Sequence, residues 1–309
     1  RLLLALPLRE FAFVIVHISL AVQARSFVDL ELIPARQRLD FVAAKAAAIR
    51  LRESYLGEGL LLFLAYAAAI GTRLFLDVGT GDSSWERVGK SLTPAGWWHM
   101  LVSLPFLYFL ILRWAWVIVC WGGFLFQISR LDLQLTSTHP DRAGGLGFLA
   151  WGVAAFAPLL TAMSAVVAAG LADGMYHQGL LLKDLKYDVF GYVAVVILIV
   201  YAPLLSFLPA LSRCRFKGLL DIGKLVWDHD RAFEKKWLEE GADHRQDLVG
   251  SPDISSLADA GTIYEHVNEM RLFPFDLKAF AVLIIAAMAP FAVLLPVKEF
   301  ILSFGELLI

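Results

Sequence analysis

Residues 97–126 read WWHMLVSLPFLYFLILRWAWVIVCWGGFLF, a run in which Arg113 is the only formal charge. A helix needs about 20 mostly apolar residues to cross the hydrocarbon core of a bilayer. The run is longer than this minimum and carries almost no charge. It therefore predicts a membrane-spanning helix.

Five other stretches of the chain are of the same kind. Together with the run above they give six expected spans, at Leu2–Val22, Tyr55–Leu76, Trp97–Phe126, Leu146–Ala172, Val189–Leu211 and Leu277–Phe304. No ten-residue pattern of alternating hydrophobicity recurs, as it would in the strands of a membrane β-barrel. The sequence therefore predicts an all-α fold, a polytopic transmembrane helical bundle with about six spans.

The composition excludes several other classes of protein. Hydrophobic residues make up 59% of the chain and charged residues 18%, whereas soluble domains are about 45–50% apolar. A formal net charge of −2 leaves no broad basic face for nucleic acid. Two cysteines, Cys120 and Cys214, are too few for a disulfide scaffold or a four-cysteine zinc site. We expect the lipid bilayer as a partner and no nucleic acid.

Lys and Arg are distributed unevenly over the connections between the spans. Most of them lie in segments 23–54, 127–145 and 213–275, which share one side of a six-span bundle. Because cytoplasmic loops carry an excess of Lys and Arg, we expect these segments to be cytoplasmic and the protein to lie in a bacterial inner (plasma) membrane. This orientation puts Arg1 outside, and the chain does not begin with Met, so we expect one more span upstream.

The connector 23–54 is expected to contain an amphipathic helix over residues 35–53. Pro34 stands where proline favours a helix start, and apolar residues follow it at helical spacing. We expect Arg36 and Asp40 to form an ion pair across one turn. We also expect this helix to continue into the second span.

Segment 213–275 is the only sizeable soluble piece that the sequence predicts. Apolar residues at three- and four-residue steps predict two helices, the first ended by Gly241 and the second by Pro274. Two such helices cannot form an independent core. They must bury their apolar faces against each other, against segment 35–53 or against a neighbouring subunit, which favours a homo-oligomer or a larger membrane complex.

The predicted organisation therefore has three parts. Residues 1–212 form a transmembrane bundle of five spans, including the amphipathic cytoplasmic connector 23–54. Residues 213–275 form a cytoplasmic helical hairpin, and residues 276–309 form the last transmembrane span.

Residues 138–149, which read THPDRAGGLGFL and are called the glycine corner below, hold the densest group of residues capable of chemistry. His139 and Asp141 are candidates for binding a cation or responding to pH. Three glycines can expose backbone N–H groups to an anion at a helix start. The alternative is a rigid turn in which Asp141 or Thr138 caps the next helix. The candidate gate or ligand residues are His139, Asp141, Arg142, Gly144, Gly145 and Gly147.

The glycine corner, preceded by Ser129–Leu133, resembles a family of uncharacterised bacterial integral membrane proteins. Residues Leu92–Trp98, Ser256–Asp259 and Met270–Phe275 carry further parts of the same pattern, so the resemblance covers most of the chain. It implies one more span upstream of residue 1. It implies no activity and assigns no functional residue.

Arg113 is the one charge well inside an expected span. It follows Trp98 by 15 residues, which puts it roughly 22 Å into a core of about 30 Å. A charge at that depth usually faces protein or water. Arg113 either attracts anions in a pore or extends its side chain to the cytoplasmic interface.

Prolines interrupt several of the expected spans. Pro158 and Pro203 lie in the similar strings Phe156–Leu160 and Tyr201–Leu205, near the middle of consecutive spans. Broken helices at matched positions point to a transport site. They also occur in membrane helices without that role, when neighbours bond the freed carbonyls.

Few residues are arranged for metal binding or catalysis. Asp228–Asp230 and the pair His266 and Glu269 contain ligand-type side chains, but the pair is only half of a di-iron arrangement. Metalloprotease, nucleophile-elbow and nucleotide-binding motifs do not occur in a usable context. We expect no metal and no cofactor, and the sequence leaves enzymatic activity open while favouring a protein that is not an enzyme. An enzyme that uses His139 and Asp141 is the least favoured hypothesis.

Two functional hypotheses remain. The first is a homo-oligomeric channel or transporter for a small ion or solute, based on the interrupted spans, Arg113 and the glycine corner. The second is a non-catalytic structural or accessory subunit of a larger membrane complex. It rests on the lack of acidic residues deep in the spans and on the two cytoplasmic helices without a core of their own.

Overall fold

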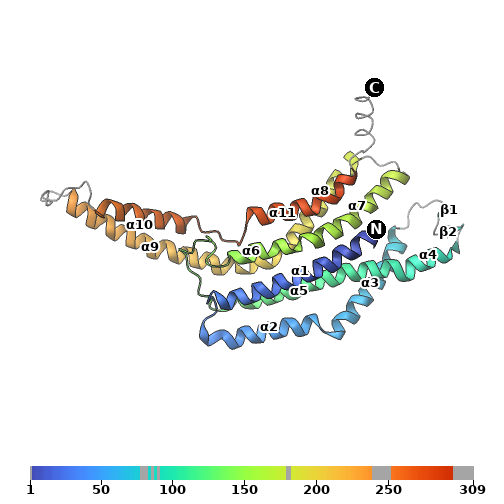
Figure 1. The fold of residues 1–309 in the computed structure, drawn as a ribbon, viewed down its shortest axis with the longest axis horizontal. Helices are drawn as coiled ribbons and strands as arrows, with labels where there is room; N and C mark the ends of the chain where they lie inside the picture. The colour runs from blue at the N-terminus through green and yellow to red at the C-terminus, as the bar shows by residue number, and fades with distance from the viewer. Residues whose placement is uncertain are drawn as a thin grey trace, which may run out of the picture. The chain divides into compact units, whose positions relative to one another are not determined.

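A computed structural model describes residues 2–76, 83–84, 87–88, 91–178, 182–238 and 252–294, and their side chains over 13–72, 91–175, 185–238 and 252–294. These residues are almost entirely helical, as predicted (Figure 1). Three two-residue strands form a small antiparallel sheet: β1 (Ser83–Ser84), β2 (Arg87–Val88) and β3 (Ser91–Leu92).

The α-helices, in chain order, are α1 (Leu2–Asp29), α2 (Arg38–Arg52), α3 (Tyr55–Leu76), α4 (Pro94–Trp98), α5 (Leu104–Ser129), α6 (Gly147–Val153), α7 (Ala157–Gln178), α8 (Leu182–Tyr201), α9 (Leu208–Trp237), α10 (Pro252–Asn268) and α11 (Leu277–Met288). Shorter 3₁₀ segments are η1 (Ala35–Gln37), η3 (Ala154–Phe156), η4 (Ala202–Phe207) and η5 (Ala289–Leu294), and η2 (His99–Ser103) is a π-helix.

Five stretches of the described residues are long and apolar enough to cross a membrane. They are Tyr55–Thr72, Pro94–Ser129, Gly147–Met175, Leu185–Trp237 and Leu277–Leu294. By length and composition, the chain is therefore a multi-pass helical membrane protein, and five of the predicted spans fall on these stretches.

The remaining predicted span, Leu2–Val22, falls on α1. The backbone there is helical, but the side chains of residues 1–12 lie outside the described set, so this span stays a prediction. The end of the last predicted span, from residue 295 onward, also lies outside the described residues.

The chain divides into two compact units. Unit 1 comprises Arg1–Arg38 and Ser129–Ile309, and unit 2 comprises Leu39–Ile128. In unit 1, α1 and α11 both pack against α7, and α9 lies beside α10 (Figure 1). Large side chains that are fully buried in this unit include Phe27, Leu149, Leu160, Leu204, Phe207, Leu211 and Leu283.

Unit 2 contains most of α2 together with α3, α4, η2 and α5. Aromatic rings pack inside it, with Trp121 stacked on Phe124 at 5.2 Å and Phe41 against Phe124 at 5.9 Å. The hydroxyls of Thr72 and Tyr108 are 2.7 Å apart and join α3 to α5.

The predicted helix over residues 35–53 is present as η1 and α2, but it does not continue into the second span. The chain leaves the helix at Ser54, whose Oγ accepts a hydrogen bond from the N–H of Gly57 at 3.3 Å. A serine that bonds an N–H three residues ahead starts a new helix, which is α3. The predicted partner of Arg36 was also wrong, because Arg36 pairs with Asp132 at 2.8 Å.

The α9–α10 pair occupies the segment that was predicted as a hairpin. Lys236 Nζ lies 2.6 Å from Asp253 Oδ2, and the His229 ring is 3.1 Å from the hydroxyl of Ser256. Gly241, the predicted end of the first helix, and most of the predicted linker lie outside the described residues. Helix α10 begins at Pro252 and ends before Pro274.

Candidate functional site

The glycine corner lies in unit 1, between the end of α5 and the start of α6. It turns through left-handed backbone conformations at Arg142, Gly144 and Gly145, where φ is 53°, 65° and 97°. Asp141 lies at its centre and accepts three backbone hydrogen bonds. Its Oδ1 accepts from Ala143 at 2.8 Å and Gly145 at 3.1 Å, and its Oδ2 accepts from Gly147, the first residue of α6, at 2.8 Å.

Two of the glycines lie where a side chain would be too close to a neighbouring residue, Asp141 for Gly147 and Leu32 for Gly145. A Cβ on Gly147 would lie 2.9 Å from the Cβ of Asp141. A Cβ on Gly145 would lie 3.0 Å from Leu32, at a backbone conformation that favours glycine. Any side chain at either position would push the carboxylate of Asp141 or the neighbouring α1 end away.

The electrostatics of the corner keep Asp141 ionised. Burial raises the pKa of its carboxyl, but the backbone N–H groups of Ala143, Gly147 and Gly145 and the ring of His139 lower it further, so the pKa lies below its usual value. His139 Nδ1 is 2.8 Å from Asp141 Oδ1. Hydrogen bonds to the charged form stabilise a carboxylate in this way.

This geometry bears on the two interpretations of the corner. Both oxygens of Asp141 already accept hydrogen bonds from the chain, and the N–H groups of Gly145 and Gly147 already donate to it. The groups that an outside cation or anion would use are therefore engaged. The arrangement favours the rigid-turn interpretation, in which Asp141 caps α6 from six residues upstream.

The end of α10 and the residues that follow it contact His139 and Arg142 of the corner. His266 Nε2 lies 3.0 Å from the carbonyl oxygen of His139, and the N–H of Arg271 donates to the carbonyl of Arg142 at 2.7 Å. Arg142 also forms an ion pair with Glu269 at 2.8 Å. The corner thus joins the α9–α10 pair to the start of α6.

Sequence reasoning did not foresee this junction. It considered His266 and Glu269 only as an incomplete set of metal ligands and gave them no other role, whereas their described contacts are with His139 and Arg142 of the corner. Among the described residues no group of three His, Cys, Asp or Glu side chains is placed to hold a metal ion. The spacing of three residues between His266 and Glu269 puts both on one face of a helix. This spacing was the only sign in the sequence that the two side chains contact the same neighbouring segment.

Arg113 has a partner in unit 2. Its Nη1 lies 2.6 Å from Oε1 of Glu58, in the first turn of α3. The pair compensates both charges, which weighs against Arg113 as a free charge that attracts anions. Sequence reasoning missed Glu58, although the expected spans run antiparallel and place both residues toward the same end.

Pro158 and Pro203 lie where helices change their hydrogen-bonding pattern. Pro158 is the second residue of α7, directly after η3, and Pro203 is the second residue of η4. Ser206 Oγ donates to the carbonyl of Pro203 at 2.8 Å, and Thr161 Oγ1 lies 3.1 Å from the carbonyl oxygens of Ala157 and Ala286. Hydroxyl groups therefore bond carbonyls next to both interruptions.

No protein-family model matches the chain, and no curated protein or solved structure matches it either. The resemblance to uncharacterised bacterial membrane proteins stays an expectation. The functional argument therefore depends on the residues and contacts described above.

Proposed function

We propose that the chain is a membrane transport protein, a homo-oligomeric channel or transporter for a small ion or solute in the bacterial inner membrane. One observation carries the proposal: two spans of unit 1 are interrupted by 3₁₀ segments, η3 between α6 and α7 and η4 between α8 and α9. Interrupted helices free backbone carbonyls within the membrane and are typical of transport sites. A stretch of 3₁₀ helix inside a longer helix also often marks a hinge.

These two segments, and the 3₁₀ segment η5 that follows α11, belong to helices that pack together. Segment η3 contacts α1 and α11, and η5 contacts α7. Segment η4 contacts both α8 and α9, between which it lies in the chain. Bending at η4 therefore changes the direction of α9 relative to α8, and α9 is the helix that pairs with α10.

The glycine corner connects this bending to a second place in the bundle. The corner holds the end of α10 through His266, Glu269 and Arg271, and its Asp141 holds the first turn of α6. A movement of the α9–α10 pair would reach α6 and α7 through these contacts. We propose that the corner transmits a movement of the α9–α10 pair to α6 and so contributes to gating. Segments 127–145 and 213–275 lie on the cytoplasmic side in this proposal.

Flux measurements on the purified chain in liposomes test the proposal. We expect uptake of at least one small ion or solute above empty liposomes, in a panel of monovalent and divalent cations, anions and small neutral solutes. Substitution Pro203→Ala should change the rate severalfold, because alanine restores a backbone N–H that can donate to the carbonyl of Ile199 and extend α8 into η4.

Pro209→Ala is the matched control. Pro209 is exposed and lies in the first turn of α9, where proline costs a helix little, so its replacement should leave the rate unchanged. No flux of any solute in the panel would contradict the proposal. Equal effects of the two substitutions would contradict the role of η4.

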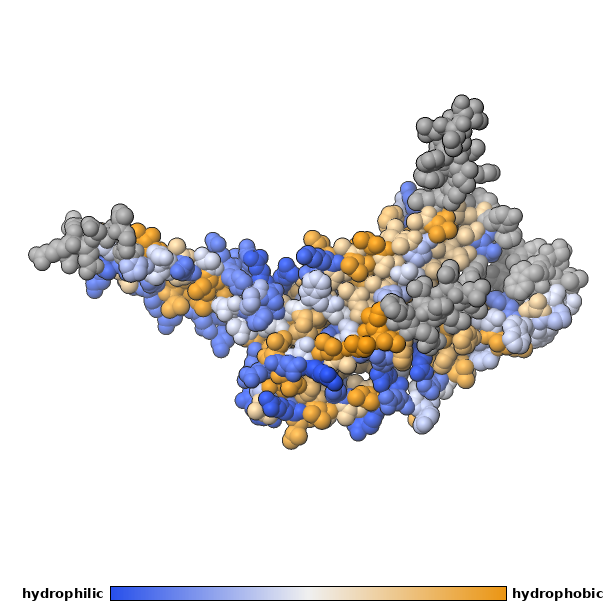
Figure 2. Space-filling view, viewed as in Figure 1, coloured by the Kyte–Doolittle hydropathy of each residue, from blue (hydrophilic) through white to orange (hydrophobic). Residues whose placement is uncertain are grey.

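A second candidate is an accessory subunit of a larger membrane complex. It is favoured by exposed apolar side chains along α9: Phe216 is 66% exposed, Leu220 59% and Trp227 61%. Figure 2 shows hydrophobic side chains among hydrophilic ones over the region of α9 and α10. Co-purification of a stoichiometric partner from the membrane, together with absence of flux, would support this candidate over the first.

A further inference from the structure

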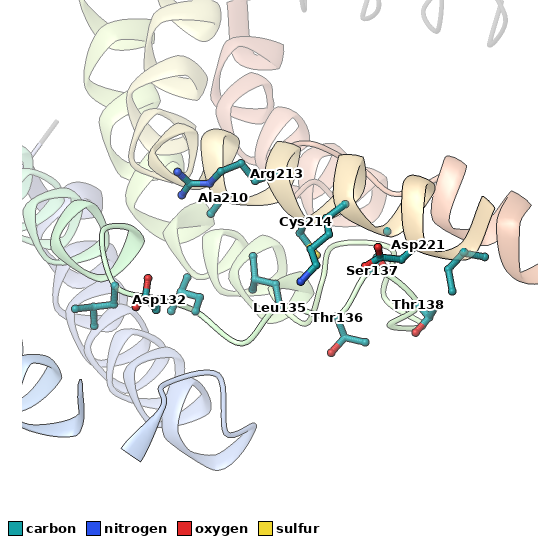
Figure 3. A pocket seen from close by; sticks show the side chains of 14 residues that line it. Asp132, Leu135, Thr136, Ser137, Thr138, Ala210, Arg213, Cys214 and Asp221 are labelled. Atoms are coloured by element: carbon teal, nitrogen blue, oxygen red, sulfur yellow. The ribbon is translucent and has the colours of Figure 1, made fainter. Parts of the chain in front are cut away.

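A groove of about 630 Å³ lies in unit 1 between the segment 131–138 and one face of α9 (Figure 3). Its volume falls within the range of small-molecule sites, roughly 300–1,000 Å³. Both sides of the groove mix apolar and polar side chains: the segment contributes Leu131, Leu133 and Leu135 beside its hydroxyl groups, and α9 contributes Ala210 and Ile222 beside its charged residues. The groove therefore suits a ligand with an apolar and a charged part.

Two basic side chains of α9 line the groove one turn apart, Arg213 and Lys217. Both are exposed, and neither forms an ion pair with a described residue. Arg215 lies between them in sequence but is engaged elsewhere, since its Nη2 donates to the carbonyl of Asn268 at 2.7 Å. Arg213 and Lys217 thus present two positive charges to the groove.

Two acidic residues also line the groove, and neither cancels these charges fully. Asp132 pairs with Arg36 at 2.8 Å, so it is already compensated. Asp221 lies near Ser137, whereas Arg213 lies near Ala210 at the other end (Figure 3). The end of the groove near Ala210 and Arg213 is therefore positive.

This positive end lies close to the end of a membrane span. The apolar run of α8, η4 and early α9 ends at Leu211, and Arg213 follows two residues later. Basic residues at this position in a chain meet the lipid headgroups, where each one near an anionic surface contributes to binding. The hydroxyls of Thr136, Ser137 and Thr138 add hydrogen-bond donors to the lining.

We infer that this groove binds a phosphate group, either the phosphodiester of an anionic lipid or free phosphate, with Arg213 and Lys217 as its cationic partners. The inference is independent of whether the chain transports a solute. Lysine and arginine side chains one turn apart can contact one phosphate together, and the apolar side chains of the groove accommodate the glycerol and upper chain of a lipid.

Binding of short-chain phosphatidylglycerol, phosphatidylcholine and inorganic phosphate to the purified full chain in neutral detergent tests this inference. Phosphatidylglycerol should bind more tightly than phosphatidylcholine. Arg213→Gln and Lys217→Gln should each weaken phosphatidylglycerol binding roughly fivefold and together roughly thirtyfold. Both side chains are exposed on a helix, so their replacement should leave the fold intact. The melting temperature of each variant checks this.

The matched control is the double variant Arg231→Gln with Lys235→Gln. These residues are exposed on the same helix with the same spacing and do not line the groove. Their replacement should change binding less than threefold. Equal weakening by the two double variants would overturn the inference, because binding would then reflect general charge.

The remaining outcomes separate the two sources of phosphate. Binding of inorganic phosphate that depends on Arg213 and Lys217, without preference for phosphatidylglycerol, would support the site and assign it a soluble anion. Preference for phosphatidylglycerol with the same dependence would assign it a lipid. No binding of either phosphatidylglycerol or inorganic phosphate, or binding that does not depend on Arg213 and Lys217, would overturn it.

Discussion

At the scale of single residues, Asp141 determines the local structure more than any other side chain of the glycine corner. It accepts hydrogen bonds from Ala143, Gly145 and Gly147 and contacts the ring of His139. Charge-assisted hydrogen bonds are about twice as strong as neutral ones. The conformation of the corner therefore depends on one ionised carboxylate.

Substitution Asp141→Asn tests this dependence. The amide has one acceptor oxygen and would place N–H donors against N–H donors, so we expect a loss of about 2 kcal/mol in the free energy of unfolding. Thermal unfolding in detergent measures the change. Asp132→Asn is the control, because Asp132 forms an exposed ion pair worth at most about 1 kcal/mol. Equal losses in the two variants would contradict the central position of Asp141.

The lowered pKa of Asp141 predicts a pH dependence. A carboxyl with a lower pKa in the folded state stabilises the fold at pH values above its unfolded pKa of about 3.9. This contribution is lost as the pH falls from about 4 through the lower folded pKa. Melting temperatures of the parent and Asp141→Asn should therefore converge below about pH 4. A difference that is unchanged at pH 3 would show that the charge of Asp141 is not responsible.

The Glu58–Arg113 pair predicts a rescue by exchange of charges. Glu58→Gln should destabilise the protein by about 1–2 kcal/mol, because Arg113 then lacks a charged partner within the membrane. The double variant Glu58→Arg with Arg113→Glu should recover most of that loss. Thermal unfolding of Glu58→Arg, of Arg113→Glu and of the double variant measures the coupling, and additive losses in the double variant would contradict a direct pair.

At the scale of elements, the contact between segment 131–138 and α9 requires a small residue in α9. Gly218 of α9 packs against Ser137, and a Cβ on Gly218 would lie 2.4 Å from the Cβ and Oγ of Ser137. The same Cβ would lie 3.0 Å from Val267 of α10. Three segments therefore meet at one glycine.

Gly218→Ala should lower the free energy of unfolding by about 1–3 kcal/mol, through the overlap with Ser137. Gly261→Ala in the interior of α10 is the matched control. A Cβ there meets nothing within 4 Å, so this substitution should raise helix stability by about 0.5–1 kcal/mol. Thermal unfolding compares the two, and a stable Gly218→Ala protein would show that the three segments pack more loosely than described.

The sequence was sufficient for the helices and insufficient for the contacts between distant segments. Apolar runs and prolines predicted the spans and the two helices of segment 213–275, because these follow from local composition. The break at Ser54 and the partner of Arg36 were missed, since they depend on one hydroxyl and on a residue 96 positions away. The contact of His266 with His139 is likewise long-range, and no periodicity encodes it.

At the scale of the whole molecule, the apolar helices of each unit need a membrane as their solvent. The described spans and the excess of Lys and Arg in three connections together predict an orientation. In that orientation the glycine corner, the groove between segment 131–138 and α9, and the α9–α10 pair all lie on the cytoplasmic side. The same orientation predicts that α4 lies on the opposite side.

Labelling of single cysteines with a membrane-impermeant maleimide in intact and permeabilised cells tests this orientation most directly. In a background without Cys120 and Cys214, two exposed positions serve as reporters, Ala95→Cys in α4 and Ser255→Cys in α10. The account predicts that Ala95→Cys reacts in intact cells once the outer envelope is open, and that Ser255→Cys reacts only after the inner membrane is permeabilised. Reaction of Ser255→Cys in cells with an intact inner membrane would contradict it.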